Sequence, residues 1–539
     1  MRHTRLYTGP WRWAYLAACC TALAGGGIAH AENTAAATGA EPRFDVEAYD
    51  VDGAKLLKQE EIETAVYPFL GPGRTRDDVE HARAALEKAY HDRGYQSVVV
   101  EVPAQSVSEA VIRLHVVEAP IGRLRVMGSR YFSPDFIKAQ TPSLKEGEVA
   151  NFKQTEAELA DVNRLADRRV TPLLRAGEAP GTVDIDLKVT DTLPVHASVE
   201  LNNDHNENTE PLRLITSVHY DNLWQLGHSA SFTYSVAPQN SANSQVFAGS
   251  YLAPLWTTPW NVLVFGYDSN SNVASLGGTT VLGKGYSVGM RFIDQLPSLG
   301  GFAQSLSIGA DFKHFDQDVV VKGAATTAPV TYAPLDASYT VQRERGQNSL
   351  KLTVSLTAGL GQLGSDTAEY QVVRSLARPE FIHFNVDISA TQGLWLGAQG
   401  AEHLVGQIAD GPLASSEQFS AGGLTSVRGY LQSEAIGDNG VNGSFELRSP
   451  HLESLAGRRI GRYIDDLRVF AFVDAAAVQV VAPLPAQTDF FDLYSTGAGV
   501  RFQLLKYLKG EADIGVPLTA GAVTRADKPR ISFSVKSEF

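Results

Sequence analysis

The segment Ile531-Ser-Phe-Ser-Val-Lys-Ser-Glu-Phe539 decides the fold, because apolar and polar residues alternate along it. One face carries Ile531, Phe533, Val535 and Phe539, and the other carries Ser532, Ser534, Lys536 and Glu538. A period of two residues is that of a β-strand, whose successive side chains point to opposite faces. The segment therefore predicts a strand with one apolar and one polar face.

The same alternation recurs throughout the chain after Pro194. It is clear in residues 195–202, 229–236 and 350–356, and polar turns separate the segments. We count about sixteen segments, which begin near residues 195, 211, 227, 245, 260, 281, 303, 335, 349, 379, 395, 441, 467, 495, 508 and 531. Repeated segments of about 10 alternating residues are typical of a transmembrane β-barrel. The pattern predicts such a barrel over residues 194–539, with a soluble β-sandwich or propeller as the alternative.

The amino terminus has the features of a secretory signal peptide. Arg2, Arg5 and Arg12 precede an apolar run over 13–24, and Ala29-His30-Ala31 is a small-residue cleavage site. Residues 1–31 are predicted to be removed, which takes the formal net charge from −14 to −17 because three arginines and no acids are lost. Such an acidic chain argues against nucleic acid as a partner.

Both cysteines, Cys19 and Cys20, lie in the apolar part of this peptide, so we expect no disulfide or thiol chemistry after cleavage. A lipoprotein site that retains Cys19 is the alternative. No other run of 18 apolar residues occurs, so a membrane role would have to rest on a barrel.

Two similar α+β modules are predicted between the peptide and the barrel. After a flexible leader over 32–43, residues 44–118 show the order strand, helix, helix, strand, strand, and residues 119–193 repeat it. In the first module a helix begins after Thr75 and ends at Gly94, as capping and helix-stop preferences predict. A pair of unrelated α+β domains is the alternative.

The glycine-rich segment Phe419-Ser-Ala-Gly-Gly-Leu-Thr-Ser-Val-Arg-Gly-Tyr430 is the main candidate for a functional site. Gly422 and Gly423 permit close approach of backbone to backbone. Arg428 presents a rigid set of donors that favours a buried carboxylate. An ordinary hairpin loop with a surface arginine is the alternative.

Asp474 is a candidate for that carboxylate. In the strand Arg468-Val-Phe-Ala-Phe-Val-Asp-Ala475, alternation places Val469, Ala471 and Val473 on one face. If this apolar face meets lipid, Asp474 points into the barrel. A solvated aspartate in the lumen is the alternative.

These segments resemble the two-partner secretion transporters, which carry two POTRA (polypeptide-transport-associated) domains before an outer-membrane barrel. The glycine-rich loop, Tyr90-His-Asp-Arg-Gly-Tyr95 and Val102-Pro-Ala-Gln105 carry the resemblance. Further matches are Asn222-Leu-Trp-Gln-Leu-Gly227, Glu417-Gln-Phe419, Gly437-Asp-Asn-Gly440, Ser444-Phe-Glu-Leu447 and Val516-Pro-Leu518. The resemblance implies POTRA domains over 44–118 and 119–193.

The resemblance also implies roles for particular residues. It makes 411–440 an inward loop whose transport motif is Val427, Arg428, Gly429 and Tyr430, with Gly422 and Gly423 as loop glycines. It assigns Asp474 as the barrel-wall partner of Arg428. It makes Phe539 part of a carboxy-terminal signal for insertion into the membrane.

The resemblance implies a translocator in the outer membrane of a Gram-negative bacterium, with its POTRA domains in the periplasm. These domains would bind a secreted exoprotein, a β-helical adhesin, haemolysin or toxin, which leaves through the barrel without nucleotide. The other expected partners are outer-membrane lipid, lipopolysaccharide and, during biogenesis, the barrel-assembly machinery. The alternatives are a barrel-assembly factor and a diffusion porin. No catalytic motif, cofactor motif or metal-ligand spacing occurs, so we expect neither an enzyme nor a cofactor or metal.

Overall fold

The computed structural model describes residues 42–106, 110–255, 258–271, 273–276, 279–321, 324–457, 461–485 and 487–539. The predicted signal peptide, 1–31, lies outside the described residues, and so does the leader except for residues 42 and 43. The described residues form two compact units, one that extends to Ala89 and includes Val99–Val117, and one of Tyr90–Val98 with Glu118–Phe539.

The first module contains a small sheet and two α-helices. Its elements are β1 (Phe44–Val46), β2 (Ala48–Asp52), α1 (Gln59–Val66), η1 (Tyr67–Phe69), β3 (Gly71–Arg74), α2 (Arg76–Asp92), β4 (Val99–Glu101) and β5 (Val111–Val117). The main sheet has the order β2-β5-β4, and β1 pairs with β3. Thr75 caps α2, since its backbone N–H donates to Asp78 at 2.9 Å and its Oγ1 accepts from the Asp78 N–H at 3.4 Å. Val79, Ala82 and Leu86 form the buried stripe of α2.

The second module repeats this arrangement in unit 2. Its elements are β6 (Ile121–Met127), α3 (Pro134–Ala139), α4 (Phe152–Val162), β7 (Arg168–Ala176) and β8 (Val183–Asp191). The sheet order β6-β8-β7, with its first pair parallel and its second antiparallel, matches that of the first module. Its core includes Ile137, Leu144, Ile185 and Leu187, each at most 1% exposed. The predicted domain boundaries remain predictions.

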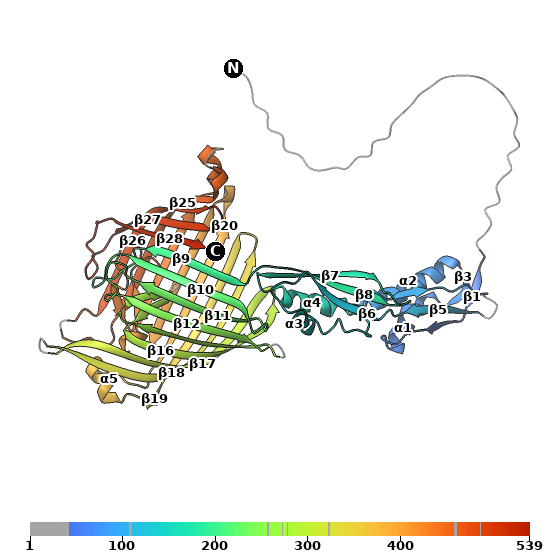
Figure 1. Ribbon diagram of the computed structural model, residues 1–539, viewed down its shortest axis with the longest axis horizontal. Helices are drawn as coiled ribbons and strands as arrows, with labels where there is room; N and C mark the ends of the chain where they lie inside the picture. The colour runs from blue at the N-terminus through green and yellow to red at the C-terminus, as the bar shows by residue number, and fades with distance from the viewer. Residues whose placement is uncertain are drawn as a thin grey trace, which may run out of the picture. The chain divides into compact units, whose positions relative to one another are not determined.

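A closed antiparallel barrel follows (Figure 1). In the part of the chain that the structure describes, its sixteen strands are β9 (Val195–Asn202), β10 (Arg213–Leu223), β11 (His228–Val236), β12 (Gln245–Pro254), β13 (Trp260–Ser269), β16 (Lys284–Leu299), β17 (Phe302–Val321), β18 (Ala324–Arg345), β19 (Asn348–Gly364), β20 (Ile382–Gly393), β21 (Gln399–Ala409), β24 (Asn439–Arg448), β25 (Ile464–Gln479), β26 (Phe490–Leu504), β27 (Leu508–Pro517) and β28 (Arg530–Glu538). β28 pairs with β9 and closes the barrel, so the sheet has no free edge. The predicted barrel of about sixteen strands is confirmed.

Only one strand begins far from its predicted position. β18 begins at Ala324 rather than near 335, and its first residues are Ala324-Ala-Thr-Thr-Ala-Pro329. Small side chains and a proline give no alternation of large apolar residues. The hydrogen-bonded ladder with β17, which runs from Val321 opposite Ala324, extends the strand there.

The elements between the barrel strands are short. They are β14 (Val273–Leu276), β15 (Thr279–Leu282), α5 (Thr367–Val373), η2 (Trp395–Gly397), η3 (Ser415–Glu417), β22 (Phe419–Ala421), β23 (Ala435–Gly437), η4 (Glu453–Ala456) and η5 (Gly461–Tyr463). None of the helices among the described residues is long and apolar enough to cross a membrane.

The outer face of the barrel is apolar. Phe232 on β11, Val288 on β16 and Leu356 on β19 are each more than 40% exposed. The alternating positions, such as Asp311 on β17 and Asp474 on β25, are buried and polar. This inward polar face positions the candidate site.

Candidate functional site inside the barrel

The loop between β21 and β24 lies against the inner wall of the barrel. Its strands β22 and β23 pair as a hairpin. A buried apolar cluster joins the loop to β25 and β26, and it consists of Phe419, Ala421, Val427, Tyr430, Ala435, Ala476, Val478 and Leu493. Val427 is 0% exposed, so the first residue of the predicted motif is a packing residue of this loop.

The loop glycines adopt backbone conformations that other residues rarely adopt. Gly422 and Gly423 have φ values of 110° and 103°. A Cβ atom on Gly422 would lie 2.3 Å from the carbonyl oxygen of Leu431, and one on Gly423 would lie 2.8 Å from Asp204 Oδ1. Both positions therefore require glycine for conformation and for space.

Arg428 binds Asp474 through two side-chain nitrogens. Its Nε donates to Asp474 Oδ2 and its Nη2 to Asp474 Oδ1, each at 2.8 Å. The backbone N–H of Arg428 also donates to Asp474 Oδ2 at 3.0 Å. Arg428 is 6% exposed and Asp474 is 0% exposed. This bidentate pair fastens the loop tip to β25 at a buried position.

Glu446 on β24 is a second acid at the loop tip, and the sequence prediction did not include it. Arg428 Nη1 donates to Glu446 Oε2 at 2.9 Å. The other oxygen of Glu446 accepts from Arg501 at 3.0 Å and from Arg448 at 2.6 Å. Ser444 donates to Asp474 Oδ1 at 2.7 Å. Glu446 lies in the segment Ser444-Phe-Glu-Leu447, which resembles the family pattern, but the resemblance assigned no role to its residues.

An aromatic ring supports the arginine from one face. The guanidinium carbon of Arg428 lies 3.5 Å from the centroid of the Phe472 ring, which favours a cation. Small residues on the next strands make room for these groups. A Cβ on Gly497 would lie 2.4 Å from Phe472 Cζ, and a Cβ on Gly515 would lie 2.7 Å from the backbone nitrogen of Gly429. The alternation of apolar and polar residues does not predict these two glycines, because side chains and backbone on neighbouring strands and the loop leave no room for a Cβ there.

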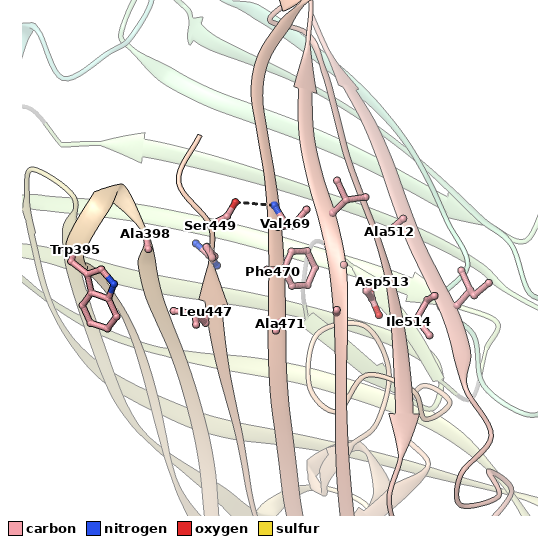
Figure 2. Close-up of a pocket in the computed structure, with 15 residues that line it drawn as sticks. Trp395, Ala398, Leu447, Ser449, Val469, Phe470, Ala471, Ala512, Asp513 and Ile514 are labelled. Carbon is pink, nitrogen blue, oxygen red and sulfur yellow. Dashed lines mark hydrogen bonds between the residues drawn. The ribbon is translucent and has the colours of Figure 1, made fainter. Parts of the chain in front are cut away.

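Asp513 is a further buried acid on this wall. It lies on β27, two strands from Phe470 on β25 (Figure 2). Asp513 is 2% exposed, and neither carboxylate oxygen has a hydrogen-bond partner among the described residues. Asp474 and Asp513 are both buried on the wall, but Asp474 accepts hydrogen bonds from Arg428 and Ser444 and Asp513 accepts none among the described residues.

Tyr430 completes the contacts of the loop tip. Its hydroxyl donates to the carbonyl oxygen of Thr519 at 2.8 Å and lies 3.0 Å from that of Tyr494. The ring belongs to the apolar cluster and is 3% exposed. The motif of residues 427–430 thus contributes one apolar contact, one ion pair, one close glycine contact and one hydroxyl contact.

Glu417 forms a separate ion cluster at the amino-terminal base of the loop. Its Oε1 accepts from Lys313 Nζ at 2.7 Å and from the Tyr332 hydroxyl at 2.5 Å, and its Oε2 lies 3.2 Å from His383 Nε2. Burial alone would raise the pKa of the Glu417 carboxyl, but Lys313 and His383 outweigh it and lower this pKa to about 2. Glu417 is therefore charged at neutral pH.

Asp438 fixes the carboxy-terminal base of the loop. Arg374, which follows α5, donates to Asp438 Oδ2 at 2.6 Å, and the backbone N–H of Val481 donates to the same oxygen at 2.7 Å. The backbone N–H of Leu413 donates to Asp438 Oδ1 at 2.8 Å. The segments Glu417-Gln-Phe419 and Gly437-Asp-Asn-Gly440 matched the family pattern, but the sequence did not reveal that both are anchors.

Phe539 lies apart from this site. Its backbone N–H donates to the carbonyl of Ala197 at 2.8 Å, and the Ala197 N–H donates back to Phe539 at 3.1 Å. The phenylalanine is 69% exposed. Its predicted role in membrane insertion stays a prediction, as do the transport roles of the loop residues.

A sixteen-stranded barrel with an apolar outer face, preceded by POTRA-like modules, defines an outer-membrane protein. The family model described as "Haemolysin secretion/activation protein ShlB/FhaC/HecB" matches residues 181–502, and "POTRA domain, ShlB-type" matches residues 44–119. The chain belongs to this haemolysin secretion/activation family. The expected class is confirmed: the protein is an outer-membrane translocator with POTRA domains on the periplasmic side.

Two curated relatives align with about three quarters of this chain. The outer membrane transporter CdiB of Escherichia coli O6:K15:H31 is 23% identical over 415 residues, 74% of this chain and 68% of the relative. The heme/hemopexin transporter protein HuxB of Haemophilus influenzae is 21% identical over 411 residues, 74% of this chain and 70% of the relative.

Solved structures agree with the fold. The structure of CdiB from Escherichia coli has a TM-score of 0.63 at 20% identity, with 94% of this chain and 93% of that chain covered. BamA from Haemophilus ducreyi lacking POTRA domains 1–3 has a TM-score of 0.55 at 16% identity, with 92% of this chain and 100% of that chain covered. At these identities the similarity concerns the fold alone.

Proposed function

We propose that the loop of residues 411–440 lines the export path and must remain docked, through Arg428, while a partner protein crosses the barrel. The observation that carries this proposal is the buried bidentate bond between Arg428 and Asp474. It holds the glycine-rich loop against the inner wall. Without this bond the loop would be free to move into the lumen. The partner is a secreted exoprotein, namely a β-helical adhesin, haemolysin or toxin, and no nucleotide is used.

Secretion of the partner tests this role. The Arg428→Ala variant should insert normally but release little partner into the medium, when release is normalised to the amount of heat-modifiable barrel. Arg291→Ala is a matched control, because Arg291 is an inward arginine on β16 that pairs with Asp311 on β17 and Asp336 on β18. Equal secretion by Arg428→Ala and by the unmodified chain would overturn the proposal.

We propose that the second POTRA domain captures unfolded partner at the edge of β7. β7 pairs with β8 on one side, and no other strand pairs with it among the described residues. Leu173 and Leu174 on this strand are 43% and 48% exposed. An extended peptide can add to such an edge through backbone hydrogen bonds, while the leucines contribute apolar contacts.

Calorimetry with the full-length chain in detergent and the unfolded amino-terminal domain of the partner tests this capture. We expect binding at roughly micromolar strength, because ordering a flexible chain opposes association. Leu173→Asp should weaken it, whereas Met127→Asp at the opposite edge of the same sheet, on β6, should not. Equal effects of both variants would exclude β7 as the capture edge.

We also propose that the apolar outer face contacts lipid and lipopolysaccharide, and that the barrel-assembly machinery recognises β28 with Phe539. The exposed ring of Phe539 beside β9 supports this recognition. Phe539→Asp should lower the amount of folded barrel in the outer membrane, whereas Phe539→Tyr should not. Unchanged barrel levels in Phe539→Asp cells would contradict it.

A further inference from the structure

Two histidines far apart in sequence become direct cross-strand neighbours at one end of the barrel wall. His196 on β9 lies opposite His219 on β10 in the ladder. Their rings stack with centroids 4.7 Å apart and planes inclined by 24°. Asp221 lies two residues beyond His219, so its side chain shares the same face of β10.

The donor atoms of these residues lie close enough to bind one metal ion. One ligand atom from each of His196, His219 and Asp221 lies within 4.8 Å of the others. Asp221 Oδ2 is 3.3 Å from His219 Nε2 and 3.9 Å from His196 Nε2. Ligands about 2.0–2.1 Å from a tetrahedral zinc ion are about 3.3 Å apart, so these separations fit such an ion with small movements.

Asp167 offers a fourth ligand from outside the barrel strands. It lies in the turn before β7, and its Oδ2 is 2.9 Å from His196 Nε2. Its side chain is 7% exposed. The group of donor atoms within 4.8 Å of one another contains the other three residues and not Asp167, so the Asp167 side chain would move toward His219 and Asp221 to complete the site. Two imidazoles and two carboxylates form a donor set that zinc and similar divalent ions accept.

Hydroxyl groups orient both carboxylates toward the histidines. Ser229 donates to Asp221 Oδ1 at 2.5 Å, and Thr192 donates to Asp167 Oδ1 at 3.2 Å. In each case the second oxygen remains directed at an imidazole. Such outer hydrogen bonds are typical of metal sites, because they fix the orientation of the ligands.

The charge of the cluster also favours a cation. Among the described residues, the ion-pair partners of Asp167 and Asp221 are histidines. With neutral histidines, the two carboxylates carry a charge that a divalent ion would balance. A second group, His451 with Glu453 and Asp466, differs because Arg468 Nη2 lies 2.5 Å from His451 Nε2 and places a cation there already.

We propose that His196, His219, Asp221 and Asp167 bind one divalent transition-metal ion of the zinc class. The ion would connect β9 and β10 to the turn before β7, and so hold the second POTRA domain against the first two barrel strands. Sequence spacing does not indicate this site, because the register of the β9–β10 ladder brings the two histidines together.

Metal binding by the full-length chain in detergent tests the site. The protein is purified without a polyhistidine tag, stripped with a chelator and titrated with Zn²⁺ against a chromophoric competitor. We expect one tight equivalent, and Co²⁺ in its place should give the intense visible absorption of a four-coordinate ion. His196→Gln and His219→Gln should each weaken binding at least about 10-fold, and Asp167→Asn should weaken it as well. His451→Gln should bind like the unmodified chain.

Heat-modifiable migration on gels verifies that each variant is folded. If a histidine variant does not fold, Asp221→Asn, which preserves side-chain size, is measured in its place. The proposal is overturned if the unmodified chain binds no Zn²⁺, or if folded His196→Gln, His219→Gln and Asp221→Asn all retain its affinity. It is also overturned if His451→Gln alone abolishes binding.

Discussion

The tip and the base of the inward loop are anchored with opposite charge arrangements. At the tip, the loop supplies the cation Arg428, and the wall supplies Asp474 and Glu446. At the base, the loop supplies the acid Glu417, and the wall supplies Lys313. Each charge of the loop is therefore matched by the opposite charge on the wall at its own end of the loop.

The largest expected effect comes from removing the cation at the tip. Arg428→Ala leaves Asp474 buried without its arginine, whereas Glu446 keeps Arg448 and Arg501. Breaking this buried pair should cost about 3–5 kcal/mol of loop-docking free energy. Single-channel conductance in planar bilayers should rise and fluctuate as the loop leaves the wall. Arg428→Lys should restore little, because an ammonium group cannot reproduce the bidentate contact.

A double mutant tests whether the tip contact is one interaction. Arg428→Ala with Asp474→Ala should be little worse than either single variant in the same conductance measurement. Additive effects would show that the two residues act separately, although each could still support the loop.

A smaller effect is expected at the base. Glu417→Gln removes the counter-ion of Lys313, but Asp311 lies 3.9 Å from the same ammonium group and compensates in part. We expect a cost of about 1–3 kcal/mol, measured as earlier cleavage of the loop by added protease. Cleavage as rapid as in Arg428→Ala would contradict this ranking.

The base should also respond to acid, with a defined sign. The pKa of Glu417 falls from 4.5 to about 2 in the folded chain, so its contribution is complete above pH 4.5 and is lost as pH falls toward 2. The difference in protease sensitivity between Glu417→Gln and the unmodified chain should therefore shrink over that range. An unchanged difference at pH 2 would refute this assignment.

The close contact beneath the tip can be tested without altering charge. Gly515→Ala places a Cβ 2.7 Å from the Gly429 nitrogen, and such overpacking should cost about 1–3 kcal/mol. Gly249→Ala is the matched control, because the nearest atom to its Cβ is 3.5 Å away. Equal thermal stability of the two variants would show that the loop tip can move aside.

The smallest effect is expected at Asp513. Since its carboxylate has no hydrogen-bond partner among the described residues, Asp513→Asn should change the free energy of unfolding by less than about 1 kcal/mol or raise it. Asp474→Asn, which loses a bidentate partner, should be clearly destabilising. Urea unfolding followed by heat-modifiable migration separates the two variants, and equal losses would indicate an unrecognised role for Asp513.

The sequence by itself determined the strand count and the inward direction of Asp474. Both follow from the two-residue period of a strand, which is local and survives wherever apolar residues mark one face. The alternation did not predict the start of β18 at Ala324, because the small residues there include no large apolar side chains that would identify one face. The motif around Arg428 was visible because it is contiguous, and its resemblance to a family supplied the partner.

Only the tertiary structure decided which distant residues meet. Glu446, Phe472 and Gly515 surround the loop tip because β24, β25 and β27 lie near one another in the closed barrel. His196 meets His219 through the register of β9 and β10. Register and closure depend on the sum of many backbone hydrogen bonds and packing contacts along whole strands, so no local pattern in the sequence specifies them.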